Sequence, residues 1–128
     1  ITRYRYNNVP ADDGGKYLEL GMPGYSIEKE IGGVKAYIKL TPQERNKLIQ
    51  YSSGENLKGV QSMKDMLKER MASPGYKENT DEAKRLDVMA IVKMYRKMGR
   101  EQLIGESPEI QKRIEDAYVR EYKAMGGQ

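Results

Sequence analysis

Residues 34–54 read VKAYIKLTPQERNKLIQYSSG, and within this stretch the chain changes from a strand pattern to a helix pattern. Apolar and polar residues alternate in the first half, which predicts a strand with one buried face. That face consists of Val34, Ala36, Ile38 and Leu40. Thr41 then precedes Pro42 and Glu44, which is the arrangement of a capping box with proline at the first helical position. We therefore expect a helix from Thr41 to about Ser52, ended by Gly54.

The residues before this stretch complete a predicted β-hairpin. The segments YSIEKEI (25–31) and VKAYIKL (34–40) flank Gly32 and Gly33, and a turn of two glycines provides the positive φ angles that such hairpins require. An isolated hairpin is only marginally stable, so we expect it to pack on the helices or to add to a sheet in a neighbouring chain. Short alternating segments at 3–6 and 16–20 extend the β-rich character toward the N-terminus as a small meander.

Helical spacing dominates after Thr41. Three more helices are expected. One covers about 56–72, and the next, at 79–104, is the longest, with Asn79 as its N-cap and Gly105 just after its end. The last, at 107–125, has Ser107 as its N-cap, Pro108 at the first helical position and an apolar stripe that includes Met125. The helix at 56–72 carries an apolar side made of Val60, Met63, Leu67 and Met71. The predicted fold class is α+β, mostly α: an N-terminal β-hairpin or small meander followed by a four-helix unit with one long central helix. We expect a β-rich arm over 1–40 and one compact helical domain over 41–128.

Composition narrows the chemistry that the chain can perform. The 128 residues include no cysteine and no histidine, which removes thiol chemistry, the usual general base and the commonest metal ligand. Carboxylates alone leave a magnesium or calcium site open, but DDGG at 12–15 lacks the ligand spacing of a calcium loop. Glu28 and Glu30 share a strand face, which is a weak basis for a hydrolase. We expect no enzymatic activity, no cofactor, no metal site and, without a long apolar run, no membrane partner.

Four basic residues in VKMYRKMGR (92–100) have helical spacing and form one stripe: Lys93, Arg96, Lys97 and Arg100. The stripe is either a contact surface for nucleic acid or another polyanion, or the solvated side of a helix. The inner side of that helix would hold Ile91, Met94, Tyr95 and Met98. The chain has 23 basic and 19 acidic residues, for a net charge of +4, with both signs interspersed. This near balance favours the solvated side and makes nucleic acid a secondary partner.

The aromatic residues of the chain are all tyrosines, ten in number. A tyrosine combines an apolar ring with a polar hydroxyl, which suits both a thin core and a protein interface. The segment RYRY (3–6) interleaves tyrosine with arginine and is expected to dock on other protein subunits together with tyrosines of the β-rich arm. The candidate docking residues are Arg3, Tyr4, Arg5, Tyr6, Tyr17, Tyr25 and Tyr37.

Two segments carry a family resemblance: residues 34–54, quoted above, and SPGYKENTDEAKRLDVMAIVKMYRKMGREQLI (73–104). They resemble C-terminal regions of large virion-associated proteins of tailed phages and prophages, of the polyvalent, internal or tape-measure-like type. The resemblance covers residues 33–125 and has no catalytic signature, so no functional residue is transferred. It implies a structural or assembly role in the virion or host cytoplasm, with copies of the same chain or other virion proteins as partners. Because the chain begins with Ile1, we expect a fragment of a longer product.

Overall fold

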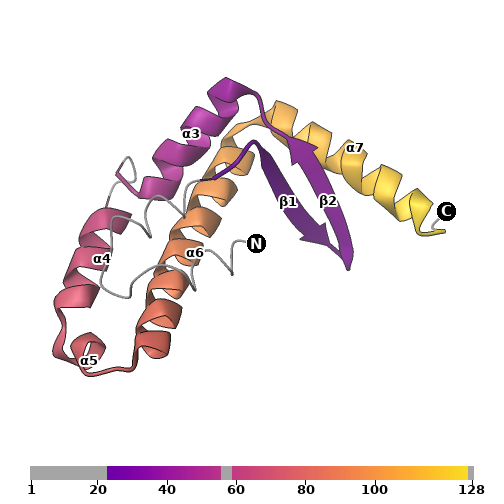
Figure 1. Ribbon diagram of the computed structural model, residues 1–128. Helices are drawn as coiled ribbons and strands as arrows, with labels where there is room; N and C mark the ends of the chain where they lie inside the picture. The colour runs from indigo at the N-terminus through magenta and orange to yellow at the C-terminus, as the bar shows by residue number, and fades with distance from the viewer. Residues whose placement is uncertain (1–22, 56–58, 127–128) are drawn as a thin grey trace.

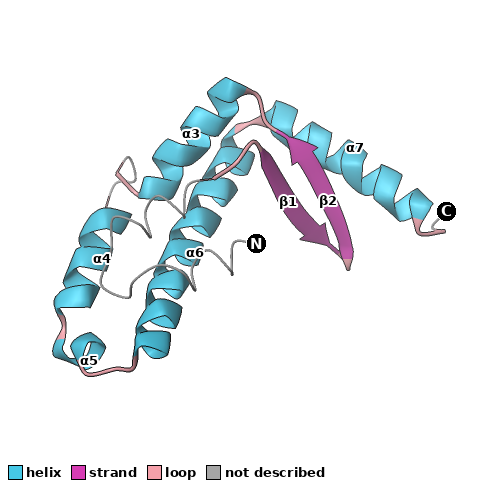
Figure 2. Ribbon diagram, in the orientation of Figure 1, coloured by secondary structure: helices cyan, strands magenta, loops and turns pink. Residues whose placement is uncertain are grey.

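The structure is a computed structural model that describes residues 23–55 and 59–126 (Figures 1 and 2). The elements are β1 (Ser26–Ile31), β2 (Val34–Lys39), α3 (Pro42–Ser53), α4 (Met63–Ala72), α5 (Pro74–Lys77), α6 (Asp81–Glu106) and α7 (Pro108–Ala124). Figure 1 shows α3 and α4 lying along the long helix α6, while α7 leaves the end of α6 and runs beside the hairpin. The predicted fold class, α+β and mostly α with an N-terminal hairpin, is confirmed.

The hairpin has the predicted turn and the predicted buried face. Strands β1 and β2 pair antiparallel with Ile31 opposite Val34, so that Gly32 and Gly33 form the turn. These glycines have φ angles of 55° and 82°, the left-handed values that both central positions of a type I′ turn require. The four alternating apolar residues from Val34 to Leu40 are all buried, and the residues between them are exposed.

Helix α3 begins with the capping box that the sequence predicts. The Thr41 hydroxyl accepts a hydrogen bond from the backbone N–H of Glu44, and the Glu44 carboxylate accepts one from the backbone N–H of Thr41 at 2.8 Å. The helix ends at Gly54, which has a φ of 76°. Local sequence is enough to define this helix because it contains both a start signal, the capping box, and a stop signal, Gly54.

The predicted second helix is wrong at its start. Helix α4 begins at Met63, and its N-cap is Ser62, whose hydroxyl accepts a hydrogen bond from the backbone N–H of Asp65. Gly59 adopts a φ of 79°, which is incompatible with an earlier helical start. Val60 therefore lies outside the helix and is exposed, not part of its apolar side. The single-turn helix α5 was not predicted, although Ser73 caps it and Pro74 follows at the first helical position.

Helices α6 and α7 differ from their predicted bounds by a few residues. Thr80, not Asn79, is the N-cap of α6, and Gly105 lies inside the helix instead of ending it. Ser107 caps α7 with Pro108 at the first helical position, as predicted. Met125, predicted on the apolar stripe of this helix, follows its last residue and is exposed, since the hairpin does not cover that end.

Two hydrophobic clusters stabilise the fold. The first joins α4 and α5 to the N-terminal half of α6 and contains Met63, Leu67, Tyr76, Val88, Met89, Val92 and Tyr95. The second joins the hairpin to α3, α7 and the C-terminal end of α6, and contains Ile27, Ala36, Ile38, Leu40, Leu48, Leu103, Ile104, Ile110, Ile114 and Ala117. The hairpin therefore buries its apolar face against the helices. The division of the chain at Thr41 into two domains stays a prediction.

Candidate functional site

The outer edge of β1 carries backbone groups that pair with no strand in the described part of the chain. The sheet consists of β1 and β2 alone. The backbone N–H of Leu40 donates to the carbonyl of Tyr25 at 2.6 Å, and hydrogen-bonded pairs then alternate along the register. By this alternation Ile27 is hydrogen-bonded to β2. The residues between the hydrogen-bonded positions of β1 direct their backbone N–H and carbonyl groups away from β2. Those residues are Ser26, Glu28 and Glu30.

The corresponding edge of β2 lies on the side of α7. The same alternation points the carbonyl of Lys39 away from β1, and this carbonyl accepts a hydrogen bond of 3.0 Å from the Arg113 guanidinium. In Figure 1 β2 lies toward α7 and β1 lies toward α6. The two edges of the hairpin therefore face different helices. On the β2 edge the Lys39 carbonyl is bonded, whereas the outward backbone groups of Lys35 and Tyr37, like those of β1, bond to no described residue.

A hollow of about 700 Å³ follows the β1 edge. Its walls come from β1 on one side and from the C-terminal turns of α6 on the other, with Gln111 of α7 also contributing. The lining residues are Glu28, Lys29, Glu30, Arg100, Glu101, Ile104, Gly105 and Gln111. An open strand edge and a groove beside it therefore occur together, and we call this hollow the β1 groove.

A second hollow, of about 240 Å³, lies beside the β1 groove and shares Glu28 and Arg100 with it. It is enclosed by the start of the hairpin, the end of α3 and the middle of α6, and we call it the Ser52 hollow. Its lining consists of Pro23, Ser26, Ile27, Glu28, Tyr37, Leu48, Ser52, Arg96 and Arg100. Among the described residues of this lining the charged groups are one carboxylate and two guanidinium groups, a net positive charge.

Ser52 is the buried polar side chain of this hollow. Only 3% of the residue is exposed, and its Oγ atom has no hydrogen-bond partner. Arg96 and Arg100 are half-buried, and neither guanidinium forms a hydrogen bond or ion pair with a residue that the structure describes. A buried polar group without a partner is uncommon in proteins and requires a reason. The Ser52 Oγ atom itself is covered and lies against Gly99, so the polar groups that line the hollow from α6 are the two arginines, without a partner among the described residues.

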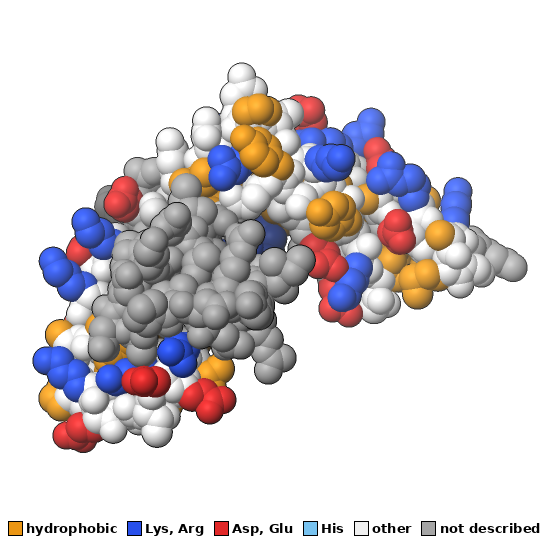
Figure 3. All heavy atoms as spheres, in the orientation of Figure 1, with side chains coloured by type: hydrophobic (Ala, Val, Ile, Leu, Met, Phe, Trp, Pro, Cys, Tyr) orange, Lys and Arg blue, Asp and Glu red, His pale blue; other side chains and the backbone are white. Residues whose placement is uncertain are grey.

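The predicted basic stripe is divided by the tertiary structure. Lys93 and Lys97 are exposed, whereas Arg96 and Arg100 are partly covered and line the Ser52 hollow. In the view of Figure 3, basic side chains alternate with acidic ones over the surface and do not gather in one field. The predicted inner side is wrong for Met94, which is 45% exposed, because Val92, Tyr95 and Gly99 point into the core. Whether the stripe contacts a polyanion stays a prediction.

The predicted docking tyrosines fall into two groups. Arg3, Tyr4, Arg5, Tyr6 and Tyr17 lie outside the described residues. Tyr25 and Tyr37 are more than half exposed, and each contacts different residues. The Arg45 guanidinium lies over the Tyr25 ring, 4.6 Å from its centroid. Tyr37 is opposite Glu28 on the outer face of the hairpin, donates its hydroxyl proton to Ser26 Oγ at 2.8 Å and lines the Ser52 hollow.

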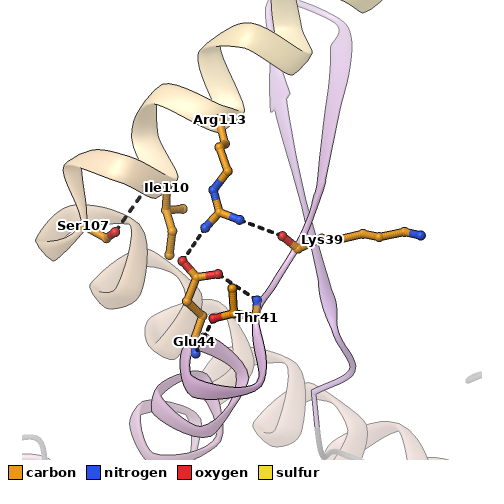
Figure 4. A network of polar contacts seen from close by, with 6 residues as sticks. All are labelled: Lys39, Thr41, Glu44, Ser107, Ile110 and Arg113. Atoms are coloured by element: carbon orange, nitrogen blue, oxygen red, sulfur yellow. Dashed lines mark hydrogen bonds and ion pairs between the residues drawn. The ribbon is translucent and has the colours of Figure 1, made fainter.

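A polar network fixes α7 to the hairpin and to the start of α3 (Figure 4). Arg113 of α7 forms a hydrogen-bonded ion pair with the Glu44 carboxylate and also donates to the carbonyl of Lys39. Burial raises the pKa of the Glu44 carboxyl, but hydrogen bonds from Arg113 and Thr41 and the positive charge of Arg113 outweigh burial. The resulting pKa lies below its usual value, so Glu44 stays charged and holds three elements together.

Sequence reasoning missed Ser52 and the close packing that buries it. Gly99 lies against the Ser52 backbone where α3 and α6 meet, and a single glycine inside a long helical pattern was the available signal. Ser52 and Gly99 are 47 residues apart in sequence and have no periodic relationship, so their contact depends on tertiary structure. Among residues 23–55 and 59–126 no group of acidic side chains is arranged to hold a metal ion. No helix in the same ranges is long and apolar enough to cross a membrane.

Comparisons of this chain with protein-family models, with characterised proteins and with solved structures find no match. Its site is therefore described by geometry alone: an open strand edge, a groove beside that edge and an adjoining hollow lined by Arg96 and Arg100.

Proposed function

We propose that the chain is a non-enzymatic protein-interaction module that binds an extended segment of a neighbouring protein subunit along β1. The observation that carries the proposal is the open backbone edge of β1 beside a groove of about 700 Å³. An added strand would pair with the outward backbone groups of Ser26, Glu28 and Glu30, and its side chains would enter the groove. Such binding needs no catalytic group, which agrees with a chain that lacks both histidine and cysteine.

The charges on β1 favour a partner that differs from this chain. If a second copy paired edge to edge with matching faces, Glu28 would lie opposite Glu28 or Glu30 of that copy, or Lys29 opposite Lys29. Like charges directly opposite each other in a sheet are destabilising. Charged residues on an edge strand also protect a protein against aggregation through that edge. The partner segment is therefore expected to carry basic residues at alternate positions, opposite Glu28 and Glu30.

The predicted docking role of Tyr37 fits this geometry. Its ring lies on the same face as Glu28 and lines the Ser52 hollow, which adjoins the β1 groove where an added strand would pass. The resemblance to virion-associated phage proteins supports an assembly role, in which subunits exchange or add extended segments. The resemblance implies that this assembly is a phage virion. The β1 edge is the surface that would contact the neighbouring subunit.

The experiment uses a proline scan of the two edges. Glu28→Pro removes an N–H that points out of the hairpin toward the groove, and Lys35→Pro removes an N–H that points out on the opposite edge. Both variants keep the hydrogen bonds between β1 and β2, so they should be similarly stable. The probes are short synthetic peptides in which valine alternates with lysine, and a matched set in which glutamate replaces lysine.

The readout is hydrogen exchange of single amides measured by NMR, together with binding measured by calorimetry. The lysine peptides should slow exchange of the amides of Ser26, Glu28 and Glu30, and Glu28→Pro should remove binding while Lys35→Pro keeps it. Equal loss of binding in both proline variants, or protection of β2 amides instead of β1 amides, would overturn the proposal. Preference for the glutamate peptides would refute the assigned charge of the partner.

A further inference from the structure

We propose that Gly105 of α6 makes the β1 groove selective for a partner segment that directs an apolar side chain of leucine size toward the end of α6. The inference rests on the proposed strand addition to β1 and goes further, because it assigns the side chain on the inner face of the added strand. The inner face of the hairpin is the one that packs on the helices. The charges of Glu28 and Glu30 concern only the outer face.

Neither backbone conformation nor packing in the described part of the chain requires a glycine at position 105. Gly105 lies inside α6, where glycine is less favourable than alanine. Its φ angle is not positive, unlike that of Gly54, which ends α3. A Cβ atom built on Gly105 meets no atom within 4 Å, whereas one built on Gly99 collides with Ser52. Packing between helices therefore explains Gly99 and leaves Gly105 without an internal reason.

Gly105 and Ile104 line the β1 groove from the last turn of α6. Carbonyl groups in the last turn of a helix have no partner within that helix and need one elsewhere. Gln111 of α7 bonds both of them: its Nε2 atom lies 2.7 Å from the Ile104 carbonyl oxygen and 3.3 Å from that of Gly105. The carbonyl groups of this floor are therefore already bonded. The surface that the floor offers to a ligand is apolar, namely the Ile104 side chain and the Gly105 Cα atom.

On the β1 side of the groove, Lys29 is the lining residue that shares the inner face with buried Ile27. Residues directly opposite each other in a sheet project to the same face, so the partner residue opposite Lys29 would project toward the end of α6. A basic residue there would lie beside the Lys29 charge, which is destabilising. An apolar residue would contact both the aliphatic stem of Lys29 and the floor formed by Ile104 and Gly105.

The two faces together specify an alternating segment, with basic residues opposite Glu28 and Glu30 and an apolar residue opposite Lys29. Alanine at the apolar position would leave the space above Gly105 unfilled and would forgo the burial of most of a leucine side chain. A leucine side chain can enter this space because Gly105 has no Cβ atom. A larger residue in place of Gly105 would take up the same space, so the glycine determines the size of side chain that the groove accepts.

The test compares two short peptides in which lysine alternates with leucine or with alanine. Calorimetry measures their affinities for the intact chain, and slowed amide exchange of Ser26, Glu28 and Glu30 shows that a peptide lies along β1. The wild type should bind the leucine peptide roughly tenfold more tightly than the alanine peptide. Gly105→Leu should remove this preference by weakening the leucine peptide alone. Ala90→Leu is the matched control, because it adds the same bulk at an exposed position of α6 outside the groove and should keep the preference.

The outcomes separate size selection from strand addition. Circular dichroism shows whether Gly105→Leu is folded, and Gly105→Ala is a second variant that should reduce the preference part of the way. Equal affinity of the wild type for two peptides that both protect β1, or a preference that the folded Gly105 variants leave intact, overturns size selection while strand addition stands. Equal weakening of both peptides in Gly105→Leu also overturns it, because the glycine would then admit the strand and not select a side chain. If neither peptide protects β1 in the wild type, strand addition fails and this inference fails with it.

Discussion

Gly99 of α6 and Ser52 of α3 lie so close that no side chain fits between the two helices at this point. A Cβ atom placed on Gly99 would be 2.5 Å from the backbone nitrogen of Ser52 and 2.7 Å from its Cα atom, and closer still to its Oγ atom. The atoms that block this position belong mostly to backbone, which cannot move aside as a flexible side chain does. The contact fixes the distance between α3 and α6 beside the Ser52 hollow, which Ser52 lines.

Gly99→Ala is expected to lower the free energy of unfolding by about 3 kcal/mol, because overpacking at a rigid contact forces the helices apart. Gly105→Ala is the matched control in the same helix, since a Cβ there meets no atom within 4 Å. It should instead stabilise the chain by about 0.5–1 kcal/mol through helix propensity. Urea denaturation followed by circular dichroism measures both. A Gly99→Ala variant as stable as Gly105→Ala would contradict the close packing.

Ser52→Ala should raise the free energy of unfolding by up to about 1 kcal/mol. The substitution removes a buried hydroxyl that has no hydrogen-bond partner, and burial of such a group is costly. Thermal unfolding measures the change. Ser53→Ala is the neighbouring control: the Ser53 hydroxyl donates to the carbonyl of Gln50 at 2.7 Å, so its removal should not stabilise. A clear loss of stability in Ser52→Ala would show that the hydroxyl has a structural partner.

Glu44→Gln should destabilise the chain by about 1–2 kcal/mol at neutral pH, because it weakens both the capping box and the ion pair with Arg113. The folded-state pKa of Glu44 lies below its usual value of 4.5, so the unfolded state binds more protons in acid. The stability from this group is therefore complete above about pH 4.5 and is lost as the pH falls through the folded-state pKa.

Denaturation at a series of pH values between neutral and acid measures this dependence. The wild type should lose stability more steeply below the usual pKa than Glu44→Gln, which has no carboxyl to titrate at this position. Glu78→Gln is the control, since Glu78 is exposed and its side chain bonds to no described residue. If the wild type and Glu44→Gln lost stability equally as the pH falls, a charged Glu44 in the network would be contradicted.

Tyr95→Phe should lower the free energy of unfolding by about 1–1.5 kcal/mol. The Tyr95 hydroxyl donates to the carbonyl of Gln61 at 2.5 Å, and 1% of the residue is exposed, so the change leaves a partly buried carbonyl unsatisfied. Tyr51→Phe is the control, because its hydroxyl bonds to exposed Glu106 and water can replace that bond. Chemical denaturation measures both, and a larger loss in Tyr51→Phe would contradict the burial argument.

Burial also raises the pKa of the Tyr95 hydroxyl above its usual value of 10.0. The folded state then keeps this proton to higher pH than the unfolded state does, so the associated stability is present below about pH 10 and lost above it. The pKa of Tyr51 is also raised, by its hydrogen bond with Glu106. Ultraviolet titration of tyrosinate should therefore show one fewer late-ionising group in Tyr95→Phe than in the wild type.

The hairpin and α3 could be predicted from sequence because their determinants are local. Two glycines define the turn, alternation defines the buried face of β2, and Thr41 with Glu44 defines the start of α3. Local signals were insufficient for α4, where Ser62 is the N-cap that the sequence reasoning did not identify. They also misplaced Met94, since the face that a long helix buries depends on the elements packed against it.

The sequence by itself determined that the chain forms a hairpin followed by helices, and that basic residues share one stretch of the longest helix. Only the tertiary structure decided that Arg96 and Arg100 meet Ser52 at a hollow while Lys93 and Lys97 face solvent. The physical reason is that the close contact between Gly99 and Ser52 orients α6 against α3. Periodicity specifies which residues share a helix face, but only packing between distant segments specifies what that face meets.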